Sequence, residues 1–143
     1  MPLHLIKLAV GVETLSDLAA RQQQRLVERI KRKETPELLH ITRHRPKRSV
    51  ELLNGGSIYW VVKGFITARQ RLIDFRAVTR DGVPQCALVL DPKLVPVALR
   101  AQRAFQGWRY FEAKSAPPDR TKRGAGAELP EELKRELAAL GLL

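Results

Sequence analysis

The chain has 143 residues, 44 % of them hydrophobic and 29 % charged, with a net charge of +11, a balance typical of one soluble domain with a single core. No apolar run approaches the roughly 18 residues of a membrane-spanning helix, and the single cysteine, Cys86, excludes an internal disulfide. Because the N-terminus also lacks the pattern of a signal peptide, we expect a cytoplasmic protein.

The first third of the chain predicts a strand, a helix and a second strand. Residues 2–10 are nearly all apolar and end at a glycine, as in a short buried strand. Helical periodicity follows up to about residue 33, with Thr14 or Ser16 as the N-cap. The apolar face of this helix comprises Leu15, Leu18, Ala19, Leu26 and Ile30. Residues 38–42 predict the second strand.

A basic loop and a short helix come next. The loop, residues 43–48, contains four Arg or Lys residues and no acid. The helix covers residues 49–53 and is ended by Asn54-Gly55-Gly56, residues that accept a positive φ. The amides of residues 55–57 could hold a phosphate, although a helix-end or hairpin turn is the more frequent use of such glycines.

The remaining regular segments are predicted to be strands. Residues 57–63 are rich in β-branched and aromatic side chains. Residues 66–78 fit a strand or a helix, and we favour a strand because a turn at Lys63-Gly64 would pair it with the preceding one. Asp81-Gly82 forms a turn into a strand over residues 85–90. Residues 104–111 predict the last strand, with Gly107 as a bulge or a point of close approach.

These elements predict an α+β fold, with a strongly bent antiparallel sheet or a small PUA-like β-barrel. A long N-terminal helix and a short C-terminal helix would flank it. The domain should span residues 1–112, followed by a linker or mobile segment over residues 113–128. Residues 129–143 then predict a C-terminal amphipathic helix.

The charge distribution favours a polyanionic partner. The last sixteen residues hold four acids and two bases, which leaves the first 127 residues with a net charge of +13. Arginines outnumber lysines 17 to 9, and guanidinium groups bind phosphates bidentately and stack on bases. We therefore expect a nucleic acid, RNA rather than DNA; a basic surface without an anionic partner is the alternative.

The predicted nucleic-acid site combines basic side chains with an aromatic ring and an amide. Its residues are Arg43, Arg45, Lys47, Arg48, Lys63, Arg69, Arg71, Gln106, Trp108 and Arg109. The basic loop would contact phosphates, Trp108 would stack on an unpaired base, and Gln106 would pair with a base edge. Trp60 should share a strand face with Ile58 and Val62, and it suits the core as well as a site.

Catalytic, cofactor and metal motifs are not recognised in the sequence. His40 and His44 lie four residues apart among positive charges, which disfavours a bound cation. Cys86 suits a buried, inert thiol. Two other functions stay open: an enzyme acting on a small anionic substrate, such as a nucleotide or modified base, between Trp60, Arg69, Asp91 and Trp108, or an adaptor for an acidic protein surface. The oligomeric state stays open too.

Several motifs resemble a known family. They are residues 43–48, residues 52–64 with the string Leu-Leu-Asn-Gly-Gly-Ser-Ile-Tyr-Trp-Val-Val-Lys-Gly, Arg69-Gln70, residues 88–92 and residues 105–110. In order and spacing they resemble the bacterial domain of unknown function 1489 family, from about Leu3 to Pro118. That resemblance implies no activity. A second resemblance, to the RNA-binding barrels of the PUA, ASCH and EVE group, implies a small barrel, but Gly55-Gly56-Ser57 lacks the acid of that group's Gly-Asp turn.

Overall fold

The computed structural model describes residues 2–120, which contain two α-helices and seven strands. In chain order these are β1 (Leu3–Leu8), α1 (Leu15–Lys31), β2 (Leu38–Thr42), α2 (Ser49–Leu53), β3 (Ser57–Val62), β4 (Phe65–Arg80), β5 (Val83–Leu90), β6 (Val95–Ala101), β7 (Trp108–Glu112) and a 3-10 turn, η1 (Ala113–Ser115). The fold is therefore α+β. The predicted C-terminal helix lies outside the described residues.

The strands form one mixed sheet that does not close into a barrel. Their order is β2-β5-β4-β3-β1-β7, and β6 pairs with β4 beside this path. Every pairing is antiparallel except that of β1 with β3. The long connection through α1, β2 and α2 permits this parallel pair. The expected bent sheet is thus present, but it is mixed. Strands β2 and β7 stand at the two ends of this order.

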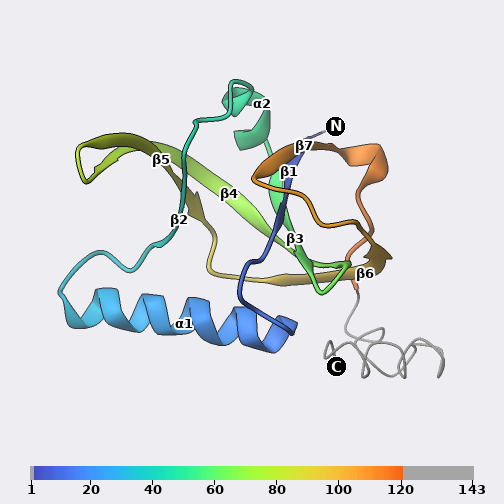
Figure 1. Cartoon of the computed structure of the whole chain (residues 1–143), viewed down its shortest axis with the longest axis horizontal. Helices are drawn as coiled ribbons and strands as arrows, with labels where there is room; N and C mark the ends of the chain where they lie inside the picture. Colours follow the sequence, from blue (N-terminus) through green and yellow to red (C-terminus); the bar gives the residue numbers. More distant parts are fainter. Residues whose placement is uncertain (1, 121–143) are drawn as a thin grey trace.

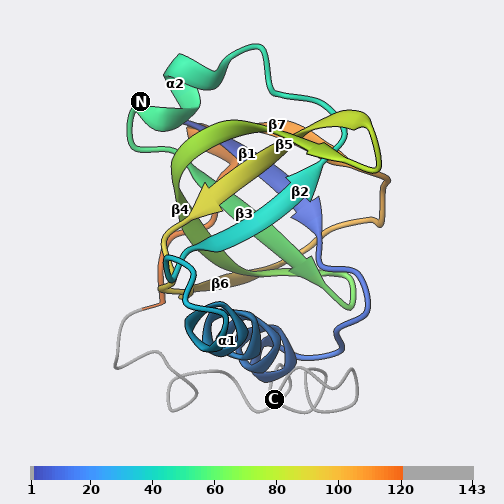
Figure 2. The same cartoon turned by 90° about the vertical axis from the view of Figure 1, so that its left-hand side faces the viewer.

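Strand β4 bends the sheet. Its first half pairs with β3 and β6, and its second half pairs with β5. The register shifts between Leu72 and Asp74, and such a bulge bends the strand and increases its twist. The sheet consequently curls, with α1 lying across one of its ends and α2 at the opposite end (Figures 1 and 2).

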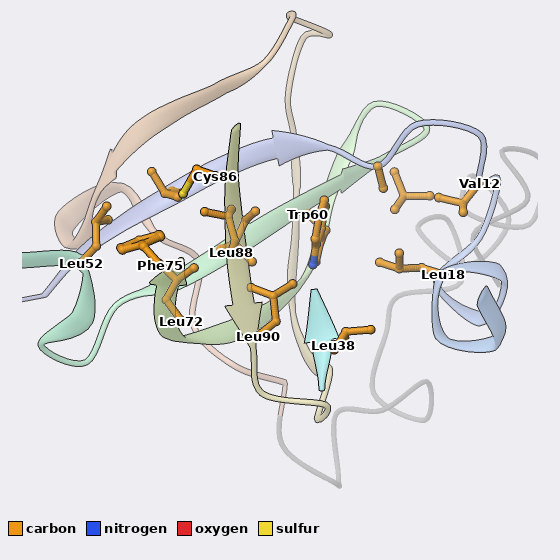
Figure 3. Packing of buried hydrophobic residues seen from close by; sticks show 14 of the residues in the cluster. Val12, Leu18, Leu38, Leu52, Trp60, Leu72, Phe75, Cys86, Leu88 and Leu90 are labelled. Atoms are coloured by element: carbon orange, nitrogen blue, oxygen red, sulfur yellow. The ribbon is translucent and has the colours of Figure 1, made fainter. Parts of the chain in front are cut away.

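The two faces of the curled sheet carry separate apolar cores. The concave core includes Ile58, Trp60 and Val62 from β3, as the alternation predicts, and Figure 3 shows Trp60 among leucines of β4, β5 and β2. The convex core contains Tyr59 and Val61 from the same strand. It is covered by β6 and the segment after β7, and within that segment Asp119 bridges to Val97.

Two tight turns explain the central hairpins. Lys63 and Gly64 have φ values of 49° and 83°, and Asp81 and Gly82 have 51° and 77°. Positive φ at both central residues is typical of type I′ turns, which match the twist of antiparallel strands. The strand interpretation of residues 66–78 is therefore confirmed.

The sequence analysis misplaced the last strands. Strand β7 begins at Trp108 rather than residue 104, because Gly107 adopts φ 71° in a turn before it. Strand β6 was not predicted. It contains Pro96, and β4 is its only partner among the seven described strands, as is typical of proline-containing strands at sheet edges.

Helix α1 is well capped but only partly buried. Thr14 Oγ1 accepts from the Asp17 amide at 3.0 Å, and the Asp17 carboxylate accepts from the Thr14 amide at 3.2 Å, which completes a capping box. Leu18 and Gln22 are its buried residues. The predicted apolar face is wrong at Ala19, which is exposed, and at Ile30, which is 60 % exposed.

Candidate functional site

A cavity of about 570 Å³ lies where the two ends of the sheet approach each other. One wall is the end of β2 with the start of the basic loop, and the opposite wall is the segment that leads into β7. Its lining residues are Lys7, Ile41, Thr42, Arg43, His44, Gln106, Gly107 and Trp108. We call it the Trp108 cavity. It brings together three of the predicted site residues: Arg43, Gln106 and Trp108.

Trp108 is held in place while part of its ring stays accessible. It pairs with Lys7 in the β1–β7 ladder, and its ring packs edge-on against Tyr110 with centroids 5.2 Å apart. The ring touches the rim of the concave core and is half-buried. The ring lines the Trp108 cavity, and the end of β2 forms the opposite wall.

The basic loop is fixed at both ends. Thr42 Oγ1 donates to the His44 carbonyl at 3.1 Å, and the Arg48 amide donates to Tyr110 Oη at 3.1 Å. Pro46 is buried in the middle of the loop. These contacts hold the loop between β2 and β7, and Arg43 at its start lines the Trp108 cavity.

Three cations of the loop are free of acidic partners. Arg43, Arg45 and Lys47 are exposed, and none forms an ion pair with any acid in residues 2–120. Arg43 and Arg45 also line a neighbouring groove of about 310 Å³ beside Cys86. Their charge is therefore available to an external anion.

Lys7 joins the Trp108 cavity to a third hollow, of about 180 Å³, beneath α1. Arg21, Arg25 and His40 also line this inner cavity. No acidic side chain within residues 2–120 lines the inner cavity, the Trp108 cavity or the groove beside Cys86. The charged side chains that line these three hollows are thus all cationic, whereas Glu28 and Glu37 line a separate groove beside Leu39 of β2.

Two predicted site arginines are neutralised instead. The Arg48 guanidinium donates to both oxygens of Glu51, at 2.6 and 3.1 Å, and this hydrogen bonding raises the pKa of Arg48. Arg69 donates to both oxygens of Asp119 at 2.7 Å. Both arginines therefore serve structural contacts, and Arg69 fixes the segment after β7 to β4.

Three other predicted residues lie away from the cavity. Lys63 pairs with Glu13 at 3.5 Å in the β3–β4 turn. Arg109 neighbours Trp108 in β7 but lies over the Phe105 ring at 4.5 Å. Arg71 is exposed on β4 and lines none of the hollows described above.

Lys7, Thr42 and His44 line the cavity but were missed by the sequence analysis. Lys7 carried a usable signal, because it is the only charged residue in the apolar run 2–10. Alternation places it on the same face as Leu3 and Leu5, which belong to the concave core. A lysine on the core side of a strand is a candidate for function.

The other predicted chemistries find little support. Trp60 is buried and donates from Nε1 to Gln70 Oε1 at 2.8 Å, while Arg69 is engaged by Asp119, so the proposed pocket between them is not formed. The amides of Gly56 and Ser57 already donate to Leu52 and His4. Cys86 is buried, and burial raises the pKa of its thiol.

Residues 2–120 contain neither a metal-binding group of side chains nor a membrane-spanning helix. In this part of the chain no three His, Cys, Asp or Glu side chains are grouped so as to hold a metal ion. None of its helices combines the length and hydrophobicity needed to cross a bilayer.

The comparisons with known proteins give one match. A family model with the description "Protein of unknown function (DUF1489)" matches residues 5–143, nearly the whole chain. No curated protein and no solved structure matches it. Any function must therefore be argued from the residues of this chain.

Proposed function

The chain belongs to the DUF1489 family, a family without an assigned activity, and from the geometry of its own cavity we propose that it binds single-stranded nucleic acid, RNA in preference to DNA. Arg43, Arg45 and Lys47 contact backbone phosphates. Trp108 stacks on an unpaired base, and Gln106 hydrogen-bonds to the edge of that base. We place this binding in the cytoplasm.

One observation carries the proposal: Arg43, Gln106 and Trp108 line one cavity that has no acid among its lining residues in 2–120, and Arg45 and Lys47 of the same basic loop, like Arg43, form no ion pair in this part of the chain. Phosphate contacts supply affinity, and they need cations that no internal acid neutralises. Stacking needs a ring that is held by the protein yet accessible on one face. The Trp108 cavity combines both features.

The shape of the site favours an unpaired base over a duplex. The basic loop and Trp108 enclose a hollow, whereas duplex binding uses a helix or ribbon that enters a groove. RNA-binding proteins recognise sequence mainly in single-stranded segments, by stacking and by contacts to base edges. A cavity of about 570 Å³ is large enough for one nucleoside.

Fluorescence anisotropy with labelled oligonucleotides tests the proposal. Single-stranded RNA, single-stranded DNA and duplex RNA are titrated with the full chain between 50 and about 300 mM KCl. We expect affinity to fall steeply with salt, by about 0.7 log units per log unit of salt for each phosphate contact. The triple variant Arg43→Gln/Arg45→Gln/Lys47→Gln should lower this slope by about 2.

Matched variants separate the site from overall charge. The triple variant Lys31→Gln/Arg71→Gln/Lys93→Gln removes the same charge from exposed positions outside the hollows and should leave the slope nearly unchanged. Trp108→Leu retains apolar packing but not stacking, and should weaken binding by about 1–3 kcal/mol, whereas Trp108→Phe retains most of it. Equal effects of the two triple variants, or no binding at 50 mM KCl, would refute the proposal.

A further inference from the structure

The inner cavity combines apolar lining residues with cationic side chains. It lies between the first turns of α1, the end of β1 and the start of β2, and has a volume of about 180 Å³. Leu18, Leu38 and Trp60 supply apolar lining, while Lys7, Arg25 and His40 supply the polar groups of interest here. Its other guanidinium, that of Arg21, already donates to the carbonyls of Val10 and Gly11 at 3.0 and 2.8 Å.

His40 presents an unused polar atom in this cavity. Its Nε2 is buried and has no hydrogen-bond partner among residues 2–120, and its ring packs edge-on against Trp60 with centroids 5.3 Å apart. Burial, with Lys7 and then Arg25 nearby, lowers the pKa of His40 to about 4. Buried polar atoms are almost always hydrogen-bonded, so an unpaired one beside a cavity indicates a missing partner.

Lys7 is the second unsatisfied group. It is half-buried on the core side of β1 and forms no ion pair with an acid in residues 2–120. Burial lowers the pKa of its ammonium group. An amine withdrawn from water without a counter-charge is costly, and an anion beside it would remove that cost.

We propose that the inner cavity binds a phosphate monoester group through Lys7, Arg25 and the Nε2–H of His40. Two cationic side chains and a ring N–H donor together match an anion with several acceptor oxygens. The volume corresponds to about six waters at roughly 30 Å³ each, enough for a tetrahedral oxyanion but small for a nucleoside.

The phosphate has two possible sources. It can be free, or it can be the terminal phosphate of a strand, because Lys7 lines the Trp108 cavity as well. The second source rests on the proposed nucleic-acid function. In that case the terminal base stacks on Trp108 while its phosphate occupies the inner cavity, and the protein distinguishes phosphorylated from unphosphorylated ends.

The first experiment uses inorganic phosphate and the full chain. The His40 ring nitrogens are followed by NMR during pH titrations with and without phosphate, at constant ionic strength set with KCl. Phosphate should raise the pKa of His40 by at least about one unit, because a bound anion stabilises the imidazolium. Lys7→Met should abolish most of this shift, whereas Lys31→Met, an exposed control on α1, should not change it.

The second experiment compares oligonucleotides of one sequence with 5′-phosphate, 3′-phosphate or hydroxyl ends. We expect at least tenfold tighter binding of one phosphorylated end, and loss of that preference in Lys7→Met. Thermal unfolding checks that each variant is folded, and if Lys7→Met is not, Lys7→Gln and Arg25→Gln replace it.

The outcomes distinguish the two proposals. Phosphate binding without any oligonucleotide binding supports the phosphate site and refutes the nucleic-acid function. Phosphate binding without an end preference supports the free phosphate as ligand. Oligonucleotide binding that ignores the end, together with an unchanged His40 pKa in phosphate, refutes the phosphate site and leaves the nucleic-acid function intact.

Discussion

The two tryptophans of this chain show how neighbouring elements decide the role of a residue. Trp60 lies in an interior strand, is 3 % exposed, and uses its Nε1 to donate to Gln70. Trp108 lies in an end strand, and its ring is half-buried beside a cavity. The first tryptophan thus stabilises the fold, whereas the second is positioned to contact a ligand.

His40 should make the protein less stable in mild acid. Its pKa is about 4 in the folded chain against 6.5 for a free histidine, so the unfolded chain takes up the proton first as the pH falls. The corresponding stability is present above pH 6.5 and is lost toward pH 4. Between pH 7 and 5 we expect a loss of roughly 2 kcal/mol in the free energy of unfolding through this residue.

Urea unfolding in phosphate-free buffer at these two pH values measures the effect. Stopping at pH 5 stays above the usual pKa of the carboxylates. His40→Phe keeps a ring against Trp60 and should lose less stability in acid; His4, whose pKa is also lowered by burial, supplies the remainder. An equal acid loss in the wild type and in His40→Phe would contradict the prediction.

Gly56 should be the glycine least tolerant of substitution. A Cβ there would lie 2.2 Å from the Leu3 carbonyl oxygen and 2.3 Å from that of Leu52. Gly56→Ala must therefore separate α2 from β1, at a cost of about 3 kcal/mol. Gly82→Ala is the control, since its Cβ meets nothing and only its φ of 77° is strained, at about 1–2 kcal/mol. Chemical denaturation that ranks Gly82→Ala as the more damaging change would refute this account.

At the scale of elements, a buried amide network docks α1 on the sheet. Gln22 of α1 and Gln70 of β4 exchange two hydrogen bonds of 2.8 Å. Gln70 also accepts from Trp60 Nε1 and donates to the Asp91 carbonyl at 3.1 Å. Because α1 forms one wall of the inner cavity, this network also defines the cavity's shape.

Gln22 and Gln70 should differ in how much they contribute to the stability of the fold. Gln22→Met leaves each Gln70 amide atom with one partner, so we expect a loss of about 1 kcal/mol and faster hydrogen exchange confined to α1. Gln70→Met leaves Trp60 Nε1 and the Gln22 amide unpaired in the interior, with a loss of about 3 kcal/mol. Denaturation and exchange measurements check the order, and a larger effect of Gln22→Met would show that the network does not anchor the helix in this way.

At the scale of the whole molecule, the net charge is +11, and the cations differ in whether they form ion pairs. Arg48, Arg69 and Arg76 are each bound to a carboxylate. The cations of the three hollows have no such partner among the described residues. Within residues 2–120, cations without an ion pair line the hollows along β2 and the basic loop, and others, such as Lys31 and Arg71, lie elsewhere on the surface. Their mutual repulsion destabilises the folded state, and their charge attracts anions.

Neutralising the basic loop should stabilise the protein. At low salt, Arg43→Gln/Arg45→Gln/Lys47→Gln should raise the free energy of unfolding by roughly 0.5–1 kcal/mol, since it removes mutual repulsion. This gain should disappear in about 0.5 M KCl, where charges are screened. Calorimetry at both salt concentrations tests it. A loss of stability at low salt would mean that the loop cations make favourable contacts in the folded chain.

Local sequence determined the elements whose signals are short-range. The helix N-cap, narrowed to Thr14 or Ser16, the two hairpin turns and the strand alternation of residues 57–63 depend on neighbours in the chain, so they could be predicted. Strand β6 and the parallel β1–β3 pair depend on contacts between distant segments, and neither was predicted. The basic loop and Trp108 were identified from the sequence. The sequence did not predict which cations stay without an acidic partner.

Only the tertiary structure decided which cations stay without an acidic partner. Arg69 meets Asp119, which lies 50 residues later in the chain, whereas Arg43 meets no acid among residues 2–120. Lys7 and His40 come from different strands, and the bend in β4 that curls the sheet brings them to one cavity. Charge and hydrophobicity are properties of residues, whereas pairing, burial and enclosure depend on which residues the folded chain places side by side.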